Sequence, residues 1–165
     1  MTTRRNDEGP RESRAIAAQE VPVRTRQSGY PPPFAQRVSG RQKRPLGEYF
    51  GLTNFGVNHT TLPPGSESAL LHRHSKQDEF VFVLAGTPTL VTETGEIELA
   101  AGMCAGFPAQ GIAHQLVNRT AEDVVFIEIG DRTAGDEGSY PADDLRAVQG
   151  PDGAWVFTRK DGSSY

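Results

Sequence analysis

The chain has 165 residues, a formal net charge of −4 and a single cysteine, Cys104. This length suits one compact domain with its own core, and one cysteine excludes both an intrachain disulfide framework and a cysteine-rich zinc module. No stretch approaches the ~20 apolar residues of a membrane span, and no apolar run follows the N-terminal arginines, so we expect a soluble, cytoplasmic protein that does not enter a membrane.

Residues 1–44 form a basic segment rich in Arg, Gln, Ser and Pro. They carry ten Arg and Lys residues against four acids, a net +6, whereas the remaining 121 residues carry the other seven bases and seventeen acids, a net −10. The segment contains the rigid stretch YPPPF and little periodicity, which predicts an arm that is largely extended or disordered. Tyr30 and Phe34 are its only aromatic residues and it has no nucleic-acid-reading motif. A tail that wraps the acidic domain is therefore favoured over nucleic-acid binding.

Residues 45–131 read as a series of short β-strands. Runs such as EFVFVLAG, PTLVTET, HQLVNRT and DVVFIEIG are separated by Gly- and Pro-containing turns. Strands of roughly four to eight residues at close spacing, with no amphipathic helix between them, predict an all-β antiparallel sandwich or barrel. The missing crossover helices exclude a parallel Rossmann-type sheet.

The stretch LLHRHSKQDEF holds two of the four histidines of the chain. Residues i and i+2 of a β-strand point to the same face, so His72 and His74 present two imidazoles side by side, which is a metal-chelating pair. Glu79 lies an odd number of positions beyond His74 and would point the opposite way on one unbroken strand. The polar residues SKQD predict a turn, after which a new strand begins at Glu79 and returns its carboxylate to the histidines.

The strand EFVFVLAG, which begins at Glu79, is apolar on both faces. Val81 and Val83 share a face with Glu79 and are expected to point into the barrel. The residues expected to point outward are Phe80, Phe82 and Leu84. An outward apolar row implies that a second sheet or a subunit packs against it.

A third histidine, His114, follows the segment GMCAGFPAQG and opens the run HQLVN, a position that suits a neighbouring strand beside the first pair. The fourth, His59, has no partner at ligand spacing and is interpreted as structural or exposed. Cys104 lies in a stretch of small residues and is interpreted as a buried structural thiol. Three glycines are interpreted as turn residues that allow positive φ: Gly86, Gly102 and Gly111.

Residues 132–165 form a C-terminal extension that mixes turn residues with two apparent strands. The runs LRAVQ and AWVFTRK flank the turn GPDG. This pattern predicts a hairpin that packs on the barrel or contributes to a dimer interface.

The two histidine segments together resemble those of a small single-domain member of the cupin superfamily. The first cupin motif has the form G-x5-H-x-H-x(3,4)-E-x6-G. With one extra residue before the HxH, it is matched by Gly65, His72, His74, Glu79 and Gly86. The second has the form G-x5-P-x-G-x2-H-x3-N. With one extra residue after the proline, it is matched by Gly102, Pro108, Gly111, His114 and Asn118. The resemblance covers residues 46–131 and implies a double-stranded β-helix, a barrel of jelly-roll type. Small cupins usually form homodimers, so the resemblance and the outward apolar row of the strand EFVFVLAG together predict a homodimer.

The resemblance also implies a metal site, with one divalent transition metal ion per chain. The implied ligands are His72, His74, Glu79 and His114. Three neutral imidazoles and one carboxylate suit Fe(II), Mn(II), Ni(II), Co(II) or Zn(II), whereas calcium and magnesium prefer more oxygen ligands. Glu79 is in addition the candidate catalytic residue, as a group that moves a proton.

The metal limits the chemistry but does not select one reaction. The leading hypothesis is an enzyme of dioxygenase type acting on a small organic substrate. Two alternatives stay open: a redox-neutral cyclase, isomerase or lyase that uses the metal as a Lewis acid, and a non-enzymatic metal- or small-ligand-binding sensor. Strand alternation and proximity to the motifs suggest five residues for the substrate-binding wall: Phe50, Asn54, Phe107, Gln115 and Glu128.

Overall fold

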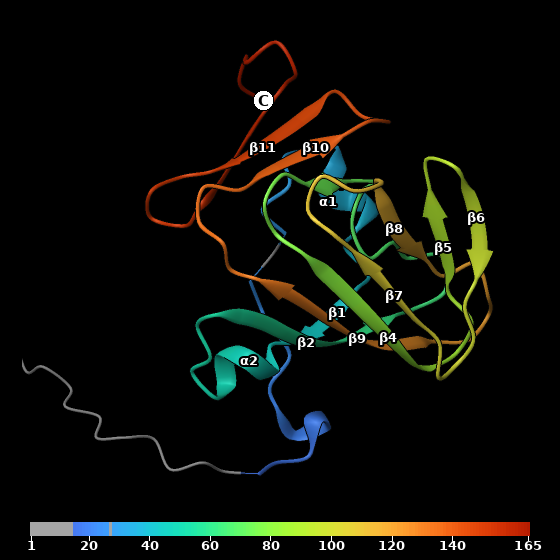
Figure 1. The fold of residues 1–165 in the computed structure, drawn as a ribbon. Helices are drawn as coiled ribbons and strands as arrows, with labels where there is room; N and C mark the ends of the chain where they lie inside the picture. Colours follow the sequence, from blue (N-terminus) through green and yellow to red (C-terminus); the bar gives the residue numbers. More distant parts are fainter. Residues whose placement is uncertain (1–14, 27) are drawn as a thin grey trace, which may run out of the picture.

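The computed structural model describes residues 15–26 and 28–165, and most of its regular secondary structure consists of β-strands (Figure 1). Its helical turns are η1 (Ala18–Glu20), α1 (Phe34–Arg37) and α2 (Leu46–Tyr49). Its strands are β1 (Gln42–Arg44), β2 (Phe55–Leu62), β3 (Arg73–His74), β4 (Glu79–Ala85), β5 (Thr89–Thr92), β6 (Gly95–Glu98), β7 (Cys104–Phe107), β8 (His114–Val117), β9 (Val124–Asp131), β10 (Glu137–Tyr140), β11 (Leu145–Gln149) and β12 (Trp155–Thr158). Within the described residues, no helix has the length and apolar character needed to cross a membrane.

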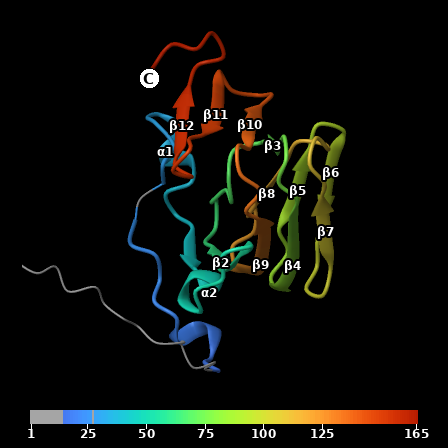
Figure 2. The same ribbon diagram turned by 60° about the vertical axis from the view of Figure 1, so that its left-hand side comes forward.

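The strands form two layers. A five-stranded antiparallel sheet has the order β1-β2-β9-β4-β7, and two smaller sheets have the orders β12-β11-β10-β3 and β6-β5-β8. An isolated bridge between His72 and His114 joins the β3 segment to β8, so the two smaller sheets make up the second layer. In Figure 2, β10, β11 and β12 lie at the top of the molecule, with β2, β9 and β4 below them. The all-β jelly-roll barrel expected from the sequence is confirmed.

Strand β4 shows how side-chain alternation builds the core. Val81 is 8% exposed and Val83 is fully buried, whereas Phe80 and Phe82 are each 39% exposed, as predicted. Burial of an apolar side chain stabilises the fold by roughly 1.5–3 kcal/mol, so a one-residue slip of β4 would be costly. Both layers contribute further buried residues to this core, among them Leu62, Leu90, Leu116, Val124 and Phe126.

The described part of the N-terminal segment packs onto the barrel. β1 pairs with β2 at the edge of the five-stranded sheet. Val21 and Val38 are each 1% exposed, and Tyr30 and Phe34 pack on a second apolar cluster. Apart from η1, α1 and β1, the described residues up to Arg44 have no regular secondary structure, and tertiary contacts hold them against the barrel. Residues 1–14 of the expected arm lie outside the described residues.

The C-terminal extension forms the predicted hairpin. β11 pairs with β12, with Val148 opposite Val156. β10 pairs with β11 on one side and with β3 on the other, where Gly138 lies opposite His74. The extension therefore borders the strand that carries the HxH pair. Its residues Tyr140, Leu145 and Ala147 form an apolar cluster with Leu70, which precedes the HxH pair.

Two local expectations are wrong. Cys104 is exposed, because it lies opposite Phe82 on the outward face of β7, which the described part of the chain leaves uncovered. Positive φ is found at Gly86 and Gly102, as predicted, but not at Gly111. A Cβ atom at Gly111 would lie 2.7 Å from the carbonyl oxygen of Pro108. Close backbone approach, rather than φ, requires glycine at this position.

Candidate metal centre

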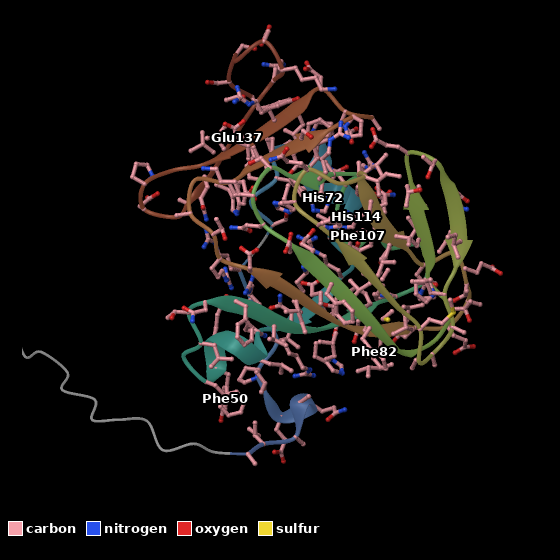
Figure 3. The ribbon with its side chains drawn as sticks, in the orientation of Figure 1. Phe50, His72, Phe82, Phe107, His114 and Glu137 are labelled. Atoms are coloured by element: carbon pink, nitrogen blue, oxygen red, sulfur yellow. The ribbon has the colours of Figure 1, made fainter. Side chains whose placement is uncertain are left out.

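The three motif histidines meet at the junction of β3 and β8. The N–H of His72 donates to the carbonyl of His114 at 3.2 Å, and the N–H of His114 donates back to His72 at 2.8 Å. The ring centroids of His72 and His74 are 5.0 Å apart, as are those of His72 and His114. Figure 3 shows His72 and His114 close together, beside Phe107. Reciprocal backbone hydrogen bonds thus bring together imidazoles that are distant in sequence.

Glu79 returns to the histidines, as the predicted turn requires. β3 ends at His74 and β4 begins at Glu79, with residues 75–78 as the turn between them. Three imidazole Nε2 atoms surround Glu79 Oε2: that of His114 at 3.1 Å, and those of His72 and His74 at 3.4 Å each. The carboxylate oxygen therefore points at the centre of the histidine group.

The arrangement of donor atoms around Glu79 fits a divalent cation. Glu79 Oε2 is buried and has no hydrogen-bond partner among the described residues. The Nδ1 of His72 donates to the carbonyl of Leu70 at 2.8 Å, which leaves the lone pair of its Nε2 directed at Glu79. Two lone pairs at this separation repel unless a proton or a cation lies between them. Ligand atoms about 2.0–2.1 Å from a metal ion stand roughly 3.0–3.4 Å apart at ordinary ligand angles, which agrees with the separations found here.

Within the described residues, His72, His74 and Glu79 form a group of possible ligands whose ligand atoms all lie within 4.8 Å of one another. His114 approaches this group through Glu79, and its ring stacks on Phe107 with 3.4 Å between the ring centroids. Burial lowers the pKa of His114, so its imidazole is neutral at pH 7 and can act as a donor to a metal.

The charges of Glu79 and His72 depend on each other. Burial alone would raise the pKa of Glu79, but the imidazoles of His114 and His72 beside its carboxylate hold it well below its ordinary value. Burial would lower the pKa of His72, but the carboxylate of Glu79 beside it outweighs this effect and raises the pKa. Glu79 is therefore ionised at neutral pH and offers a negative charge that a cation would neutralise.

Asp136, which the sequence did not point to, orients His74. Its side chain is fully buried, and its Oδ2 accepts a hydrogen bond from His74 Nδ1 at 2.5 Å. Its Oδ1 accepts from the Ser75 hydroxyl and the Lys76 N–H. Burial opposes ionisation, but the hydrogen bonds from His74 and Lys76 hold the pKa of Asp136 below its ordinary value. A carboxylate on Nδ1 fixes the tautomer and makes Nε2 a better metal ligand.

A second polar group lies on the inward face of the five-stranded sheet. Glu128 of β9 shares this face with the buried Phe126. Its Oε1 accepts hydrogen bonds from Lys43 Nζ at 2.5 Å and from Asn58 Nδ2 at 3.0 Å. The Lys43 and Glu128 side chains are 21% and 20% exposed, so the ion pair is partly buried. Lys43 lies in QKR, an ordinary polar and basic run, so no sequence pattern singles it out.

Two tyrosines from the flanking segments border the histidines. The ring of Tyr140 stacks on His72 with 6.0 Å between centroids, and Tyr30 packs edge-on against Tyr140 at 5.9 Å. Burial raises the pKa of both tyrosines, so both stay protonated at neutral pH. Arg41 donates to the carbonyl of Ser68, and its positive charge acts on both tyrosines.

Two of the five residues predicted for the substrate wall lie at the site. Phe107 is 7% exposed and stacks on His114. Glu128 faces inward with Lys43 and Asn58, as described above.

The other three wall residues are not brought to the histidines. Gln115 is buried but lies on the opposite face of β8 from His114, because neighbouring residues of a strand alternate. Phe50 is 39% exposed, and Figure 3 shows it beside α2, away from His72 and His114. Asn54 precedes β2, which begins at Phe55.

An even number of residues separates Asn54 from Asn58, so Asn54 would share the inward face if β2 extended to it, but the strand begins at Phe55. Asn58, two strand periods further along, is the asparagine that reaches the interior. His59 is 7% exposed and points to the other face of β2, in agreement with its structural interpretation.

Comparison with known proteins agrees with this architecture. The family model of the cupin domain matches residues 58–130. A sugar phosphate isomerase of the cupin superfamily from Silicibacter pomeroyi is 38% identical, with a TM-score of 0.86 over 92% of this chain and 96% of that chain. A protein from Acidithiobacillus ferrooxidans, provisionally named a sugar phosphate isomerase, is 31% identical, with a TM-score of 0.69 over 76% of this chain and 80% of that chain.

A more distant solved structure shares the fold. The polyketide cyclase from Streptomyces resistomycificus is 18% identical, with a TM-score of 0.60 over 72% of this chain and 79% of that chain. No protein with a curated description matches the sequence significantly.

Proposed function

The chain belongs to the cupin superfamily, and within it we propose that the protein is a metal-dependent isomerase of a phosphorylated sugar. The observation that carries the proposal is the 38% identity to the Silicibacter pomeroyi isomerase over 92% of the chain. A match of this length extends beyond residues 58–130 on both sides. The flanking segments supply Lys43 and Tyr140 to the surroundings of the histidines. The similarity therefore reaches past the ligand motifs that many cupins share.

The chemistry of the barrel interior supports a polar, anionic substrate. Lys43 and Arg41 provide positive charge near the histidines, and lysine and arginine are common phosphate ligands. Glu128 and Asn58 provide hydrogen-bonding groups for sugar hydroxyls. An apolar substrate would desolvate these groups without pairing them, which costs free energy.

The proposed metal ligands are the four motif residues: His72, His74, Glu79 and His114. A bound divalent ion would act as a Lewis acid that polarises the carbonyl of the substrate. Asp136 holds His74 in the tautomer that presents Nε2. Phe107 covers one face of the His114 imidazole and shields it from water. Tyr140, on β10 of the other layer from Phe107, covers a face of the His72 imidazole in the same way.

We therefore favour a redox-neutral isomerase over the dioxygenase-type enzyme that was the leading hypothesis from the sequence. The two relatives above with at least 31% identity are both named as sugar phosphate isomerases. An isomerisation needs no oxidant, whereas a dioxygenase consumes molecular oxygen. Oxygen consumption therefore separates the two functions directly.

The test is a panel of aldose and ketose phosphates incubated with the protein after loading with Mn²⁺, Fe²⁺, Co²⁺, Ni²⁺ or Zn²⁺. Products are followed by proton NMR and dissolved oxygen by an electrode. We expect interconversion of an aldose phosphate and its ketose without oxygen uptake. This activity should be lost in the His72→Ala/His74→Ala double variant and kept in His59→Gln, whose histidine lies outside the cluster. No interconversion with any metal, or turnover that consumes oxygen, would contradict the proposal.

A further inference from the structure

An isomerase that shifts a carbonyl needs a base to move a proton between neighbouring carbons, and Glu79 is poorly placed for this task. Its Oε2 points at three imidazole nitrogens at 3.1–3.4 Å, in the position of a metal ligand. A lone pair that is given to a metal is not available to accept a proton. If the protein is the isomerase proposed above, another residue must therefore be the base.

Glu128 is the other acid on the inward face of the five-stranded sheet within the described residues. In the register of β4 and β9, Glu79 lies opposite Gly130, and Glu128 lies opposite Val81. Glu79 and Glu128 are therefore diagonal neighbours on one face, a relationship that places Cα atoms roughly 7–8 Å apart. A substrate bound beside Glu79 would thus lie within reach of Glu128.

Gly130 keeps the space between the two acids open. A Cβ atom at this position would lie 3.7 Å from Glu79 Cγ and 3.9 Å from Glu79 Oε1. A larger side chain here would extend across the face that Glu79 and Glu128 share. Glycine at position 130 thus adds no side chain to the face that the two acids share.

The hydrogen bonds of Glu128 hold one carboxylate oxygen and leave the other available. Lys43 and Asn58 both donate to Oε1, and Oε2 makes no hydrogen bond with the described residues. The Lys43 ammonium has three N–H donors, of which one is engaged with Glu128. Glu128 is held in a fixed orientation, with Oε2 free to accept a proton and a positive charge close by.

We propose that Glu128 is the catalytic base of the isomerisation and that Lys43, which lies outside the matched cupin domain, is its partner. Glu128 Oε2 accepts the proton from the hydroxyl-bearing carbon beside the carbonyl. The electron pair of the broken C–H bond forms a carbon–carbon double bond, and the carbonyl oxygen takes the negative charge, which gives an enediolate. The hydroxyl proton moves to the former carbonyl oxygen, and Glu128 returns its proton to the former carbonyl carbon. The step balances without an oxidant or a reductant, and the Lys43 ammonium stabilises the transient negative charge.

The first test is the isosteric variant Glu128→Gln in the metal-loaded full-length chain. We expect kcat to fall by roughly 10²–10⁴-fold, because general-base catalysis contributes about that much, with KM and metal content little changed. Exchange of the substrate's carbon-bound hydrogen with D₂O, followed by NMR, should be lost in parallel. The matched control is Glu96→Gln. This variant removes an exposed carboxylate on β6 that pairs with Arg119, and it should leave both measurements unchanged.

A second variant separates catalysis from folding. Glu128→Gln leaves the Lys43 ammonium without its carboxylate partner, which destabilises a partly buried site. The Lys43→Met/Glu128→Gln double variant removes both charges, and we expect it to fold by circular dichroism, to bind metal and to be as inactive as the single variant. Wild-type kcat and D₂O exchange in either folded variant would overturn the assignment while the isomerase function stands. A wild-type protein that isomerises no sugar phosphate would overturn both.

Discussion

The second ring nitrogen of a histidine decides what the first nitrogen can bind. His72 donates its Nδ1–H to Leu70, and His74 donates its Nδ1–H to Asp136, so both turn Nε2 toward Glu79. A backbone carbonyl holds His72, and no side-chain substitution removes it. The partner of His74 is a side chain, which makes the contribution of its orientation measurable.

We expect Asp136→Asn to lower metal affinity by about 10–100-fold, the usual effect of losing a carboxylate partner of a ligating histidine. Competition with a chelator of known affinity measures this. The matched control is Asp161→Asn, which alters an exposed aspartate that accepts a hydrogen bond from Ser163. Equal metal affinity in Asp136→Asn and the wild type would show that Asp136 does not orient His74.

Phe107 belongs both to the core and to the site. It is buried in the main apolar cluster, and its ring stacks on His114. We expect Phe107→Ala to lower the free energy of unfolding by about 3–5 kcal/mol, because it leaves a cavity. Denaturant unfolding measures this, with Ile97→Ala as the control, since Ile97 is 58% exposed and its truncation should change stability by about 0.5 kcal/mol or less. Similar losses in the two variants would contradict the packing described for Phe107.

At the scale of elements, the sequence predicted what strand alternation controls. Four features could be predicted because each depends only on side-chain alternation along a strand or on turn residues. They are the HxH pair, the turn before Glu79, the inward valines of β4 and the C-terminal hairpin. Side-chain alternation also predicted which face of β2 points inward near Asn54, although the strand begins one residue later, at Phe55.

Contacts between distant segments were not readable. Asp136 reaches His74 across 62 positions, and Glu128 meets Lys43 across 85. β1 consists of three polar residues with little strand propensity, and it is a strand because β2 offers it an edge. Local patterns predict ligands within a motif, whereas the residues around them are set by the tertiary fold.

The N-terminal segment provides an element-scale prediction. Removal of residues 1–40 takes away Val21 and Val38, which are buried and contribute roughly 1.5–3 kcal/mol each, and the partly buried Tyr30. We expect a loss of several kcal/mol in the free energy of unfolding, measured by denaturant titration, together with a loss of isomerase activity. Arg26→Ala, at an exposed position of the same segment, should have no effect. Unchanged stability after the deletion would mean that the segment is a tail.

At the scale of the whole molecule, the outward face of β4 is the surface that bears most directly on the assembly of subunits. Phe80, Phe82 and Leu84 are 39–43% exposed, and Cys104 lies beside them on β7. An apolar row of this kind is typical of a face covered by another subunit. The homodimer predicted from the sequence remains a prediction for this face.

We expect the Phe80→Glu/Phe82→Glu double variant to be monomeric at concentrations where the wild type is a dimer, because charged side chains would have to be buried in the interface. Light scattering coupled to size-exclusion chromatography measures the mass. Val156→Glu is the matched control, since Val156 is 56% exposed on β12 and lies outside this row. A wild type that is monomeric, or a double variant that stays dimeric, would contradict the prediction.

The central claim is that His72, His74, Glu79 and His114 hold a divalent metal ion on which the isomerisation depends. Its most direct test is the metal content of the protein purified without added ions, measured by mass spectrometry of the elements. The structure predicts about one divalent transition metal ion per chain in the wild type, and an empty site in His72→Ala/His74→Ala, because two of the ligand atoms that lie within 4.8 Å of one another are removed. Full metal content in that double variant would contradict the assignment of the site.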